Sequence, residues 1–208
     1  MDNKFRGVSE RVADKSMEFL MQKPYIADLN NIQYANFNHV RKMFMYSDTL
    51  LNDLKTDKTY INIGTGFGFL EYTNKKYYQL KLKTCDLPPN VIDPLYTRMQ
   101  KYLGVEVDYD LRFMKNKDGT DLTIKGFDPF NDYTRWNTAI FIRFVPLRNT
   151  LISKQNIENF NKHMKKYVDN IIIHTVKDKG YYPNLDLFPD SRIKNINESN
   201  GVIIEYPI

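Results

Sequence analysis

The chain has 208 residues, 42% of them hydrophobic and 14% aromatic, which is enough to bury the core of one domain. A net charge of +5, with acidic residues spread through the chain, indicates a solvated surface rather than a nucleic-acid footprint. No apolar run approaches the roughly 18 residues of a membrane span, and a single cysteine excludes an intramolecular disulfide and a cysteine-cluster metal site. The first residues contain no apolar signal region, so we expect a cytoplasmic protein with no membrane segment and no bound metal.

Residues 1–56 are predicted to form helices that belong to the same domain as the rest of the chain, residues 57–208. Apolar residues recur at helical spacing in residues 8–21, and Pro24 closes that segment. A second helix is predicted from Val40 through Tyr46, and Ser47 either continues or restarts it.

A glycine-rich turn follows the first predicted strand. The β-branched run Thr59–Ile63 ends in three glycines at alternate positions, namely Gly64, Gly66 and Gly68. Glycine accepts positive φ and has no Cβ, so such a loop can turn tightly and let a ligand approach its backbone. A second strand is predicted over Tyr77–Cys85, and Asp86 follows it. A glycine turn after one strand and an acid after the next is how a βαβ unit holds a nucleoside.

The spacing of the glycines separates the classes of ligand. A dinucleotide fingerprint, G-x-G-x-x-G, would place its third glycine where this chain has Phe69. A P-loop needs Lys and then Ser or Thr after its last glycine, and neither follows Gly68 at that spacing. A protein kinase is excluded because the chain contains no H-R-D or D-F-G motif and is too short for that domain.

The loop and its flanking strands resemble motif I of the class I S-adenosylmethionine (SAM) dependent methyltransferases, h-x-h-G-x-G-x-G. The resemblance implies a methyltransferase fold over most of residues 57–208, with SAM as cofactor. It implies that Asp86 takes the ribose hydroxyls and that the loop lines the methionine end of SAM, through Gly64, Thr65, Gly66 and Gly68. The chain departs from the family at Asn62, where an acid is common, and in the short helix after Gly68. N-terminal helices of that family often cover the substrate side, whereas packing on the sheet is the alternative here.

The middle of the chain contains one predicted helix and three predicted strands. Residues 91–103 form the helix, with proline near its start and Gly104 after its end. Val105–Phe113 alternates apolar and polar residues, as a strand with one exposed face does, and Leu122–Ile124 is predicted to pair back as a hairpin. Thr138–Val145 is the strongest buried-strand run, and Trp136 before it is interpreted as a packing residue.

The last part of the chain contains an amphipathic helix and three strands. Ser153–Val168 is the helix, with Ser153 as N-cap and one apolar face formed by Ile157, Phe160, Met164 and Val168. Ile171–Val176 is a buried strand, residues 177–192 read as a loop, and residues 192–196 and 202–206 form a closing pair. This alternation predicts an α/β fold, a Rossmann-like three-layer sandwich with a mostly parallel sheet of about seven strands and an N-terminal helical extension.

The resemblance implies further site residues. Leu87 would pack against the adenine face, and Asp128 would bond the adenine amine, unless it only initiates an Asp-Pro turn. The fourth strand ends in Arg143-Phe-Val-Pro, which does not match the motif of enzymes that methylate amino groups of nucleic-acid bases. The candidate catalytic residues are His39, Arg143 and His174. Cys85 is interpreted as a buried strand residue.

These observations favour a SAM-dependent methyltransferase acting on a small-molecule acceptor. A methyltransferase-like module that binds a nucleoside or a partner without catalysis is the alternative, which Asn62 and the absence of an evident base support. A nucleic-acid-binding or -modifying protein is suggested only by the pI of 9.0. An NAD-linked enzyme ranks last because of Phe69. The sequence names neither the acceptor nor the oligomeric state.

Overall fold

The computed structural model describes residues 37–87, 94–115, 122–125, 135–142, 153–176, 185–188, 191–196 and 201–208. These residues divide between two compact units. Within the described ranges, the helical unit contains residues 37–55, Thr65–Leu80 and 94–106, and the sheet unit contains Thr56–Gly64, 81–87 and the later residues from Val107 onward. Across the parts of the chain that the structure describes, no helix is long and apolar enough to cross a membrane.

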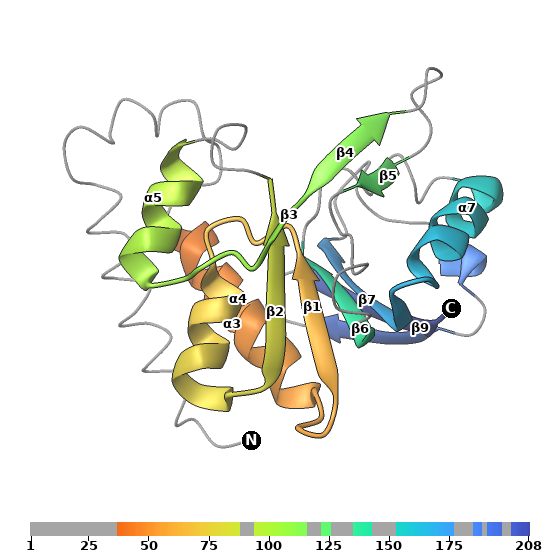
Figure 1. Cartoon of the computed structure of the whole chain (residues 1–208). Helices are drawn as coiled ribbons and strands as arrows, with labels where there is room; N and C mark the ends of the chain where they lie inside the picture. Colours follow the sequence, from red (N-terminus) through yellow and green to blue (C-terminus); the bar gives the residue numbers. More distant parts are fainter. Residues whose placement is uncertain are drawn as a thin grey trace. The chain divides into compact units, whose positions relative to one another are not determined.

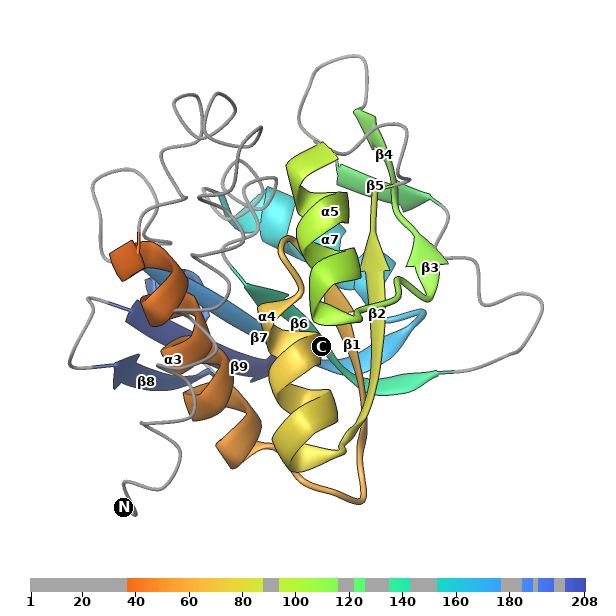
Figure 2. The ribbon, with the colours of Figure 1, turned by 90° about the vertical axis from the view of Figure 1, so that its left-hand side faces the viewer.

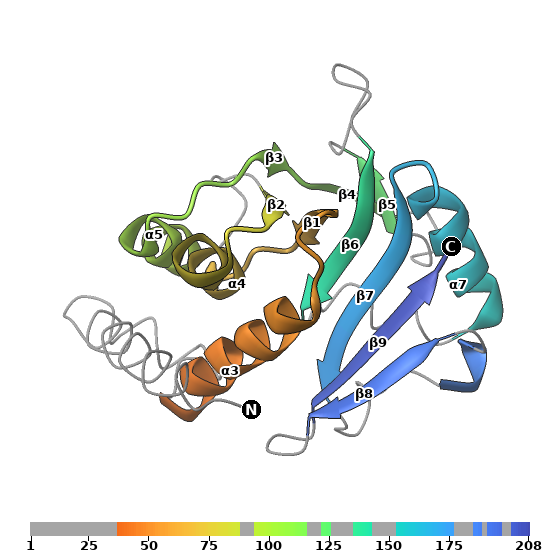
Figure 3. The same ribbon diagram turned by 90° about the horizontal axis from the view of Figure 1, so that it is seen from below.

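The sheet unit contains a seven-stranded sheet with the order β3-β2-β1-β6-β7-β9-β8. Figure 1 labels these strands except β8, which Figure 3 shows beside β9. Strands β1, β2, β3, β6 and β7 pair in parallel, whereas β9 is antiparallel to both of its neighbours. In the described sheet, β9 is therefore the one reversed strand. The bounds are β1 Thr59–Ile63, β2 Lys81–Asp86, β3 Tyr109–Asp110, β6 Trp136–Ile142, β7 Val168–Val176, β8 Arg192–Ile196 and β9 Gly201–Pro207.

Helix α7 (Lys154–Met164) covers one face of this sheet, as Figure 3 shows. Its apolar side chains join a buried cluster with β6, β7 and β9, and the rings of Phe160 and Phe141 lie 5.6 Å apart. The Ser153 hydroxyl accepts a hydrogen bond from Asn156 N at 3.2 Å, which confirms the predicted N-cap. The predicted apolar face is confirmed for its first three residues, which are Ile157, Phe160 and Met164.

Val168, however, is the first residue of β7 and not the end of the helix, so this part of the prediction is wrong. The chain leaves the helix after Met164, whose carbonyl accepts from Tyr167 N at 2.8 Å. Trp136 N then donates to the carbonyl of Tyr167 at 3.0 Å and ties the chain to the start of β6. Val168 still faces the core. Its spacing from Met164 fits the apolar face of a helix, but the same position is also buried as the first residue of the strand.

The helical unit is built from α3 (Phe37–Asp53), α4 (Phe69–Thr73), the π-helix η1 (Asn74–Tyr78) and α5 (Pro94–Leu103), and Figure 2 shows α3, α4 and α5. Its core is aromatic and aliphatic, and the ring of Phe44 on α3 lies 4.4 Å from that of Phe69 on α4. Helix α3 continues through Ser47, whose hydroxyl donates to the carbonyl of Met43 at 2.9 Å. This hydrogen bond satisfies the hydroxyl of Ser47, so a serine, which is favoured at helix N-caps, is tolerated inside the helix.

Residues 77–80 do not belong to the second strand, contrary to the prediction from the sequence. Residues 77 and 78 end η1 instead. The Asn74 side chain closes this helix end, accepting from Leu80 N at 2.9 Å and donating to the carbonyl of Leu80 at 3.1 Å. The Tyr78 hydroxyl donates to the Asp48 carboxylate at 2.6 Å. These hydrogen bonds outweigh the strand preference of an aromatic run.

The predicted strand Val105–Phe113 is also shorter than expected. Residues 109 and 110 form β3, while β4 (Arg112–Lys115) pairs antiparallel with β5 (Leu122–Lys125) in a separate two-stranded sheet. Val105 instead closes α5, because its N–H donates to the carbonyl of Gln100 at 2.9 Å. The predicted hairpin is confirmed by the β4–β5 pair, and its turn at residues 117–119 lies outside the described residues.

The predicted α/β class with a mostly parallel, seven-stranded sheet is confirmed. Trp136 is buried in the core, as predicted for a packing residue, and the closing pair is confirmed as β8 and β9. A short 3-10 helix, η3 (Leu185–Leu187), interrupts the region predicted as a loop. The predicted helix over residues 8–21 lies outside the described residues, and the division of the domain after residue 56 stays a prediction.

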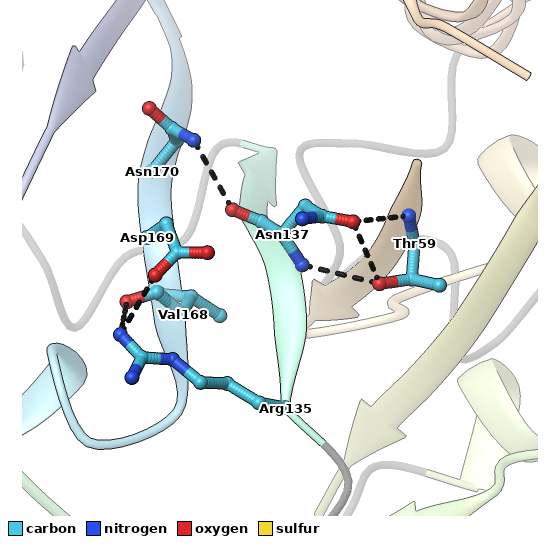
Figure 4. Close-up of polar contacts among 6 residues, drawn as sticks. All are labelled: Thr59, Arg135, Asn137, Val168, Asp169 and Asn170. Carbon is cyan, nitrogen blue, oxygen red and sulfur yellow. Dashed lines mark hydrogen bonds and ion pairs between the residues drawn. The ribbon is translucent and has the colours of Figure 1, made fainter. Parts of the chain in front are cut away.

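A polar cluster ties the amino ends of β1, β6 and β7 together (Figure 4). Asn137 Oδ1 accepts from Thr59 N at 2.9 Å and from Thr59 Oγ1 at 3.1 Å, and Thr59 Oγ1 accepts from Asn137 N at 3.1 Å. Asn170 Nδ2 donates to the carbonyl of Asn137 at 3.3 Å. The ion pair of Arg135 and Asp169 (2.7 Å) joins side chains that are 50% and 54% exposed, so it adds little stability. The reciprocal Asn137–Thr59 contact is the main polar link between these strand ends.

We expect Asn137→Ala to lower the free energy of unfolding by about 1–2 kcal/mol, because two donors of Thr59 lose their acceptor. Asn137→Asp is the matched control, since its carboxylate keeps an acceptor oxygen at the same position. Urea unfolding at neutral pH, followed by circular dichroism, measures both variants. Equal losses in the two variants would show that the acceptor is not what stabilises the strand ends.

Candidate functional site

Strand β1 lies where the order of the strands reverses. The chain passes from β1 to β2 on one side, and after β3 it returns to β6 on the other side of β1. Ligands of open α/β sheets bind outside the carboxyl ends of the strands at such a switch point. Ile63 pairs with Cys85, and Gly64 N donates to the carbonyl of Cys85 at 2.8 Å. Gly64 and Asp86 therefore leave neighbouring strands at the same edge, which brings the first glycine and the predicted acid together.

The three glycines of the loop all have positive φ, of 84°, 57° and 84° in chain order. Gly68 N donates to the carbonyl of Thr65 at 3.0 Å, which closes a tight turn. A Cβ on Gly68 would lie 3.1 Å from a methyl carbon of Val105, so contact and φ both favour glycine there. Around a Cβ built on Gly66, no heavy atom of the described chain lies within 4 Å. A methyl group added at Gly66 would therefore meet none of the described atoms.

Helix α5 holds the middle of the loop. The side-chain amide of Gln100 donates to the carbonyl of Gly66 at 2.7 Å. The ring of Phe67 stacks on Tyr96, with centroids 4.5 Å apart and 27° between the planes. No sequence motif pointed to Gln100 or Tyr96. Their spacing of four residues predicts that they share a helix face, but no local pattern connects that face with the loop.

Asp86 is 5% exposed at the end of β2. Its Oδ1 accepts from the N–H of Leu87 at 2.8 Å, and its carbonyl accepts from Leu111 N at 2.6 Å. In the middle of the same strand, Lys83 Nζ donates to Asp108 at 2.6 Å, and this hydrogen bond raises the pKa of Lys83. The bond from Leu87 orients the carboxylate of Asp86, and the bond from Leu111 holds its backbone in place. A carboxylate has acceptor capacity beyond one backbone hydrogen bond, as recognition of hydroxyl groups requires.

The remaining predicted site residues are not gathered around this edge by any contact within the described residues. His174 lies in β7 with its ring buried at 1% exposure, between its register partners Ile142 and Ile203. His39 lies in α3. Asp128 and Arg143 lie outside the described residues, so the roles of all four stay predictions. No group of three or more His, Cys, Asp or Glu in the described ranges is arranged to hold a metal ion.

No protein-family model and no curated protein matches the sequence. Solved structures match the fold. The pyocyanin biosynthetic protein PhzM has a TM-score of 0.51 at 8% identity, over 99% of this chain and 70% of that chain. A candidate O-methyltransferase of Nostoc punctiforme has a TM-score of 0.50 at 10% identity, over 81% of this chain and 57% of that chain. The chain has the fold of the class I methyltransferases.

A mutant of MtNAS in complex with S-adenosylmethionine is a further similar structure, with a TM-score of 0.48 at 13% identity over 97% of this chain and 73% of that chain. The matches with PhzM and the candidate O-methyltransferase confirm the methyltransferase fold that the glycine loop implied. At sequence identities this low, structural similarity establishes the fold only. The reaction and the methyl acceptor must be inferred from the residues of this chain.

Cys85 is buried in β2, next to the glycine loop, which confirms its interpretation as a strand residue. Burial raises the pKa of its thiol far above the usual value, and the negative charges of Asp86 and Asp110 raise it further. Because the thiolate is the reactive form of cysteine, this thiol is inert in the folded protein.

We expect Cys85 to react with a chromogenic disulfide reagent only as fast as the protein unfolds. The folded pKa lies above the ordinary value of 9.0, so the unfolded thiol ionises first as the pH rises. The contribution of Cys85 to stability is therefore present below pH 9.0 and is lost above it. Reagent kinetics with and without denaturant, repeated at neutral and alkaline pH, measure both effects. Rapid reaction of the native protein at neutral pH would contradict the buried position.

Proposed function

We propose that this chain is a SAM-dependent methyltransferase that acts on a small-molecule acceptor. One observation carries the proposal: a loop with three positive-φ glycines leaves β1 beside Asp86, at the switch point of a methyltransferase fold. Taken by itself, the positive-φ glycine backbone fits the approach of a compact polar group, and the oriented carboxylate of Asp86 fits a ribose.

In this proposal the loop residues contact the methionine end of SAM, and Asp86 accepts hydrogen bonds from the ribose hydroxyls. Leu87 packs against the adenine, and Asp128 bonds the adenine amine. The loop residues are Gly64, Thr65, Gly66 and Gly68. When bound, SAM supplies a methyl group on a sulfonium, and the transfer of such a group depends largely on the positioning of the reactants. The loop supplies this positioning through a backbone that is already held in one conformation.

The environment of Phe69 supports SAM over a dinucleotide. A dinucleotide fingerprint has its third glycine at this position so that helix and strand can pack closely. Here Phe69 is buried, and its ring lies 4.4 Å from Phe44 and 5.6 Å from Phe67. This chain therefore buries a phenylalanine ring at the position where the dinucleotide fingerprint requires a glycine.

The end of the fourth strand bears on the class of methyl acceptor. The fourth strand lacks the motif of enzymes that methylate amino groups of bases, and this supports a small molecule over a nucleic acid. A module that binds a nucleoside without catalysis is the second candidate. Asn62 favours it, because this buried residue of β1 stands where the family commonly has an acid.

The first test is a calorimetric titration with SAM, S-adenosylhomocysteine and NADH. We expect micromolar binding of the first two and none of NADH. Asp86→Ala should weaken SAM binding by about 10- to 100-fold, since it removes charge-assisted hydrogen bonds to hydroxyl groups. Asp169→Asn is the matched control, because it removes one carboxylate charge at the amino edge of the same sheet.

A folded protein that bound neither SAM nor S-adenosylhomocysteine would sink the proposal. Binding without methyl transfer to any acceptor of a broad small-molecule panel would favour the non-catalytic module.

A second test compares two glycines with similar backbones. Gly66 (φ 57°) and Gly104 (φ 65°) both have open space around a built Cβ, within the part of the chain that the structure describes. Replacement by alanine should therefore cost each position a similar strain, about 1 kcal/mol of unfolding free energy. We expect only Gly66→Ala to abolish SAM binding, because its new methyl group fills the space that the ligand uses. Equal affinity of the two variants in calorimetry would contradict a ligand at Gly66.

A further inference from the structure

The loop conformation is held from one short stretch of the helical unit. Three consecutive loop residues each contact a residue between positions 96 and 105: Gly66 O bonds Gln100, Phe67 stacks on Tyr96, and Gly68 packs on Val105. Gln100 is the one polar partner of the three, and it is 6% exposed. A buried side-chain amide that donates to a carbonyl favours one direction of that carbonyl, because turning the carbonyl away would break a hydrogen bond inside the protein.

The direction of the Gly66 carbonyl has a consequence for the next peptide group. The peptide bond between Gly66 and Phe67 is planar and trans, so its carbonyl and its N–H point in opposite directions. With the carbonyl turned toward Gln100 at 2.7 Å, the N–H of Phe67 points away from that side chain. Glycine at position 66 would otherwise let this peptide rotate easily.

The backbone of Gln100 is itself held in place. Its carbonyl accepts from Val105 N at 2.9 Å, where α5 ends, and Gly104 N donates to the carbonyl of Lys101 at 3.1 Å. The neighbouring Met99 is fully buried in the core of the helical unit. The side-chain amide that donates to Gly66 therefore belongs to the hydrogen-bonded C-terminal turn of α5 and not to a loop.

We propose that Gln100 is a positioning residue for the cofactor. It holds the Gly66–Phe67 peptide in the orientation that offers the Phe67 N–H to a hydrogen-bond acceptor of bound SAM. This inference rests on the proposed function, and it adds to it a residue outside the glycine motif. Gln100 touches the loop and acts on the cofactor only through it.

The test combines two substitutions of Gln100 with one matched control. Gln100→Met keeps the length of the side chain and removes the donor. Gln100→Glu places a carboxylate against the Gly66 carbonyl at high pH and a donating carboxylic acid there at low pH. Tyr78→Phe is the control, since it removes a hydrogen bond of the same unit, to Asp48, that does not involve the loop. The SAM dissociation constant and the melting temperature are measured for each variant and the wild type.

We expect Gln100→Met to weaken SAM binding about tenfold, the loss of one well-oriented hydrogen bond. Tyr78→Phe should lower the melting temperature and leave the dissociation constant unchanged. The ratio of the Gln100→Glu constant to that of the wild type should be large at pH ~8 and fall toward one at pH ~5, because burial raises the pKa of the new carboxyl.

Wild-type affinity in Gln100→Met together with a pH-independent ratio for Gln100→Glu would overturn the role of Gln100 and leave the methyltransferase proposal standing. The role of Gln100 is likewise overturned if Tyr78→Phe weakens SAM binding as much as Gln100→Met, since the loss would then follow stability alone. If Gln100→Met does not fold, the pH dependence of Gln100→Glu decides. A wild-type protein that does not bind SAM overturns both proposals.

Discussion

The parallel pairing of β1 with both β2 and β6 is the constraint on which the rest of the structure depends. Parallel pairing brings the carboxyl ends of these strands to one edge, and the Gly64–Cys85 hydrogen bond continues the pairing to the first glycine of the loop. The strand order reverses at this point, and ligands of open α/β sheets bind at such a switch point. The site is therefore a product of topology first and of particular side chains second.

The glycine loop adds a second constraint, which is conformational. Positive φ at alternate residues turns the backbone sharply, and side-chain partners from α5 then hold that backbone in one conformation. A flexible motif thereby becomes a rigid one, and rigidity is what ligand positioning requires. The glycines allow the backbone conformation of the loop, and the contacts with Gln100 and Tyr96 hold the loop in that conformation.

The two edges of the sheet have different roles. At the amino edge, Asn137 and Thr59 satisfy each other's polar groups and contribute stability. At the carboxyl edge, Asp86 is oriented by the N–H of Leu87, and Gly64 leaves β1 beside it. Burial of Cys85 among hydrophobic residues raises the pKa of its thiol and keeps it protonated and inert beside the proposed site. The residues that stabilise the amino edge are therefore different from those proposed to bind the ligand, so each set supplies control variants for the other.

Local patterns in the sequence determined the strands β1, β6 and β7, the cap and apolar face of α7, and the glycine loop with its acid, because each depends on residues close together in the chain. Specific hydrogen bonds decided three other features. Val105 closes α5 through a local backbone bond to Gln100, whereas the end of η1 at Tyr78 and the contact of Gln100 with Gly66 depend on partners far away in the chain. Each of these rests on a specific partner, and a pattern of apolar and polar residues does not record which partner a side chain meets. The aromatic run before β2 and the alternation after α5 both had a strand's periodicity, and hydrogen bonds formed on folding overrode it.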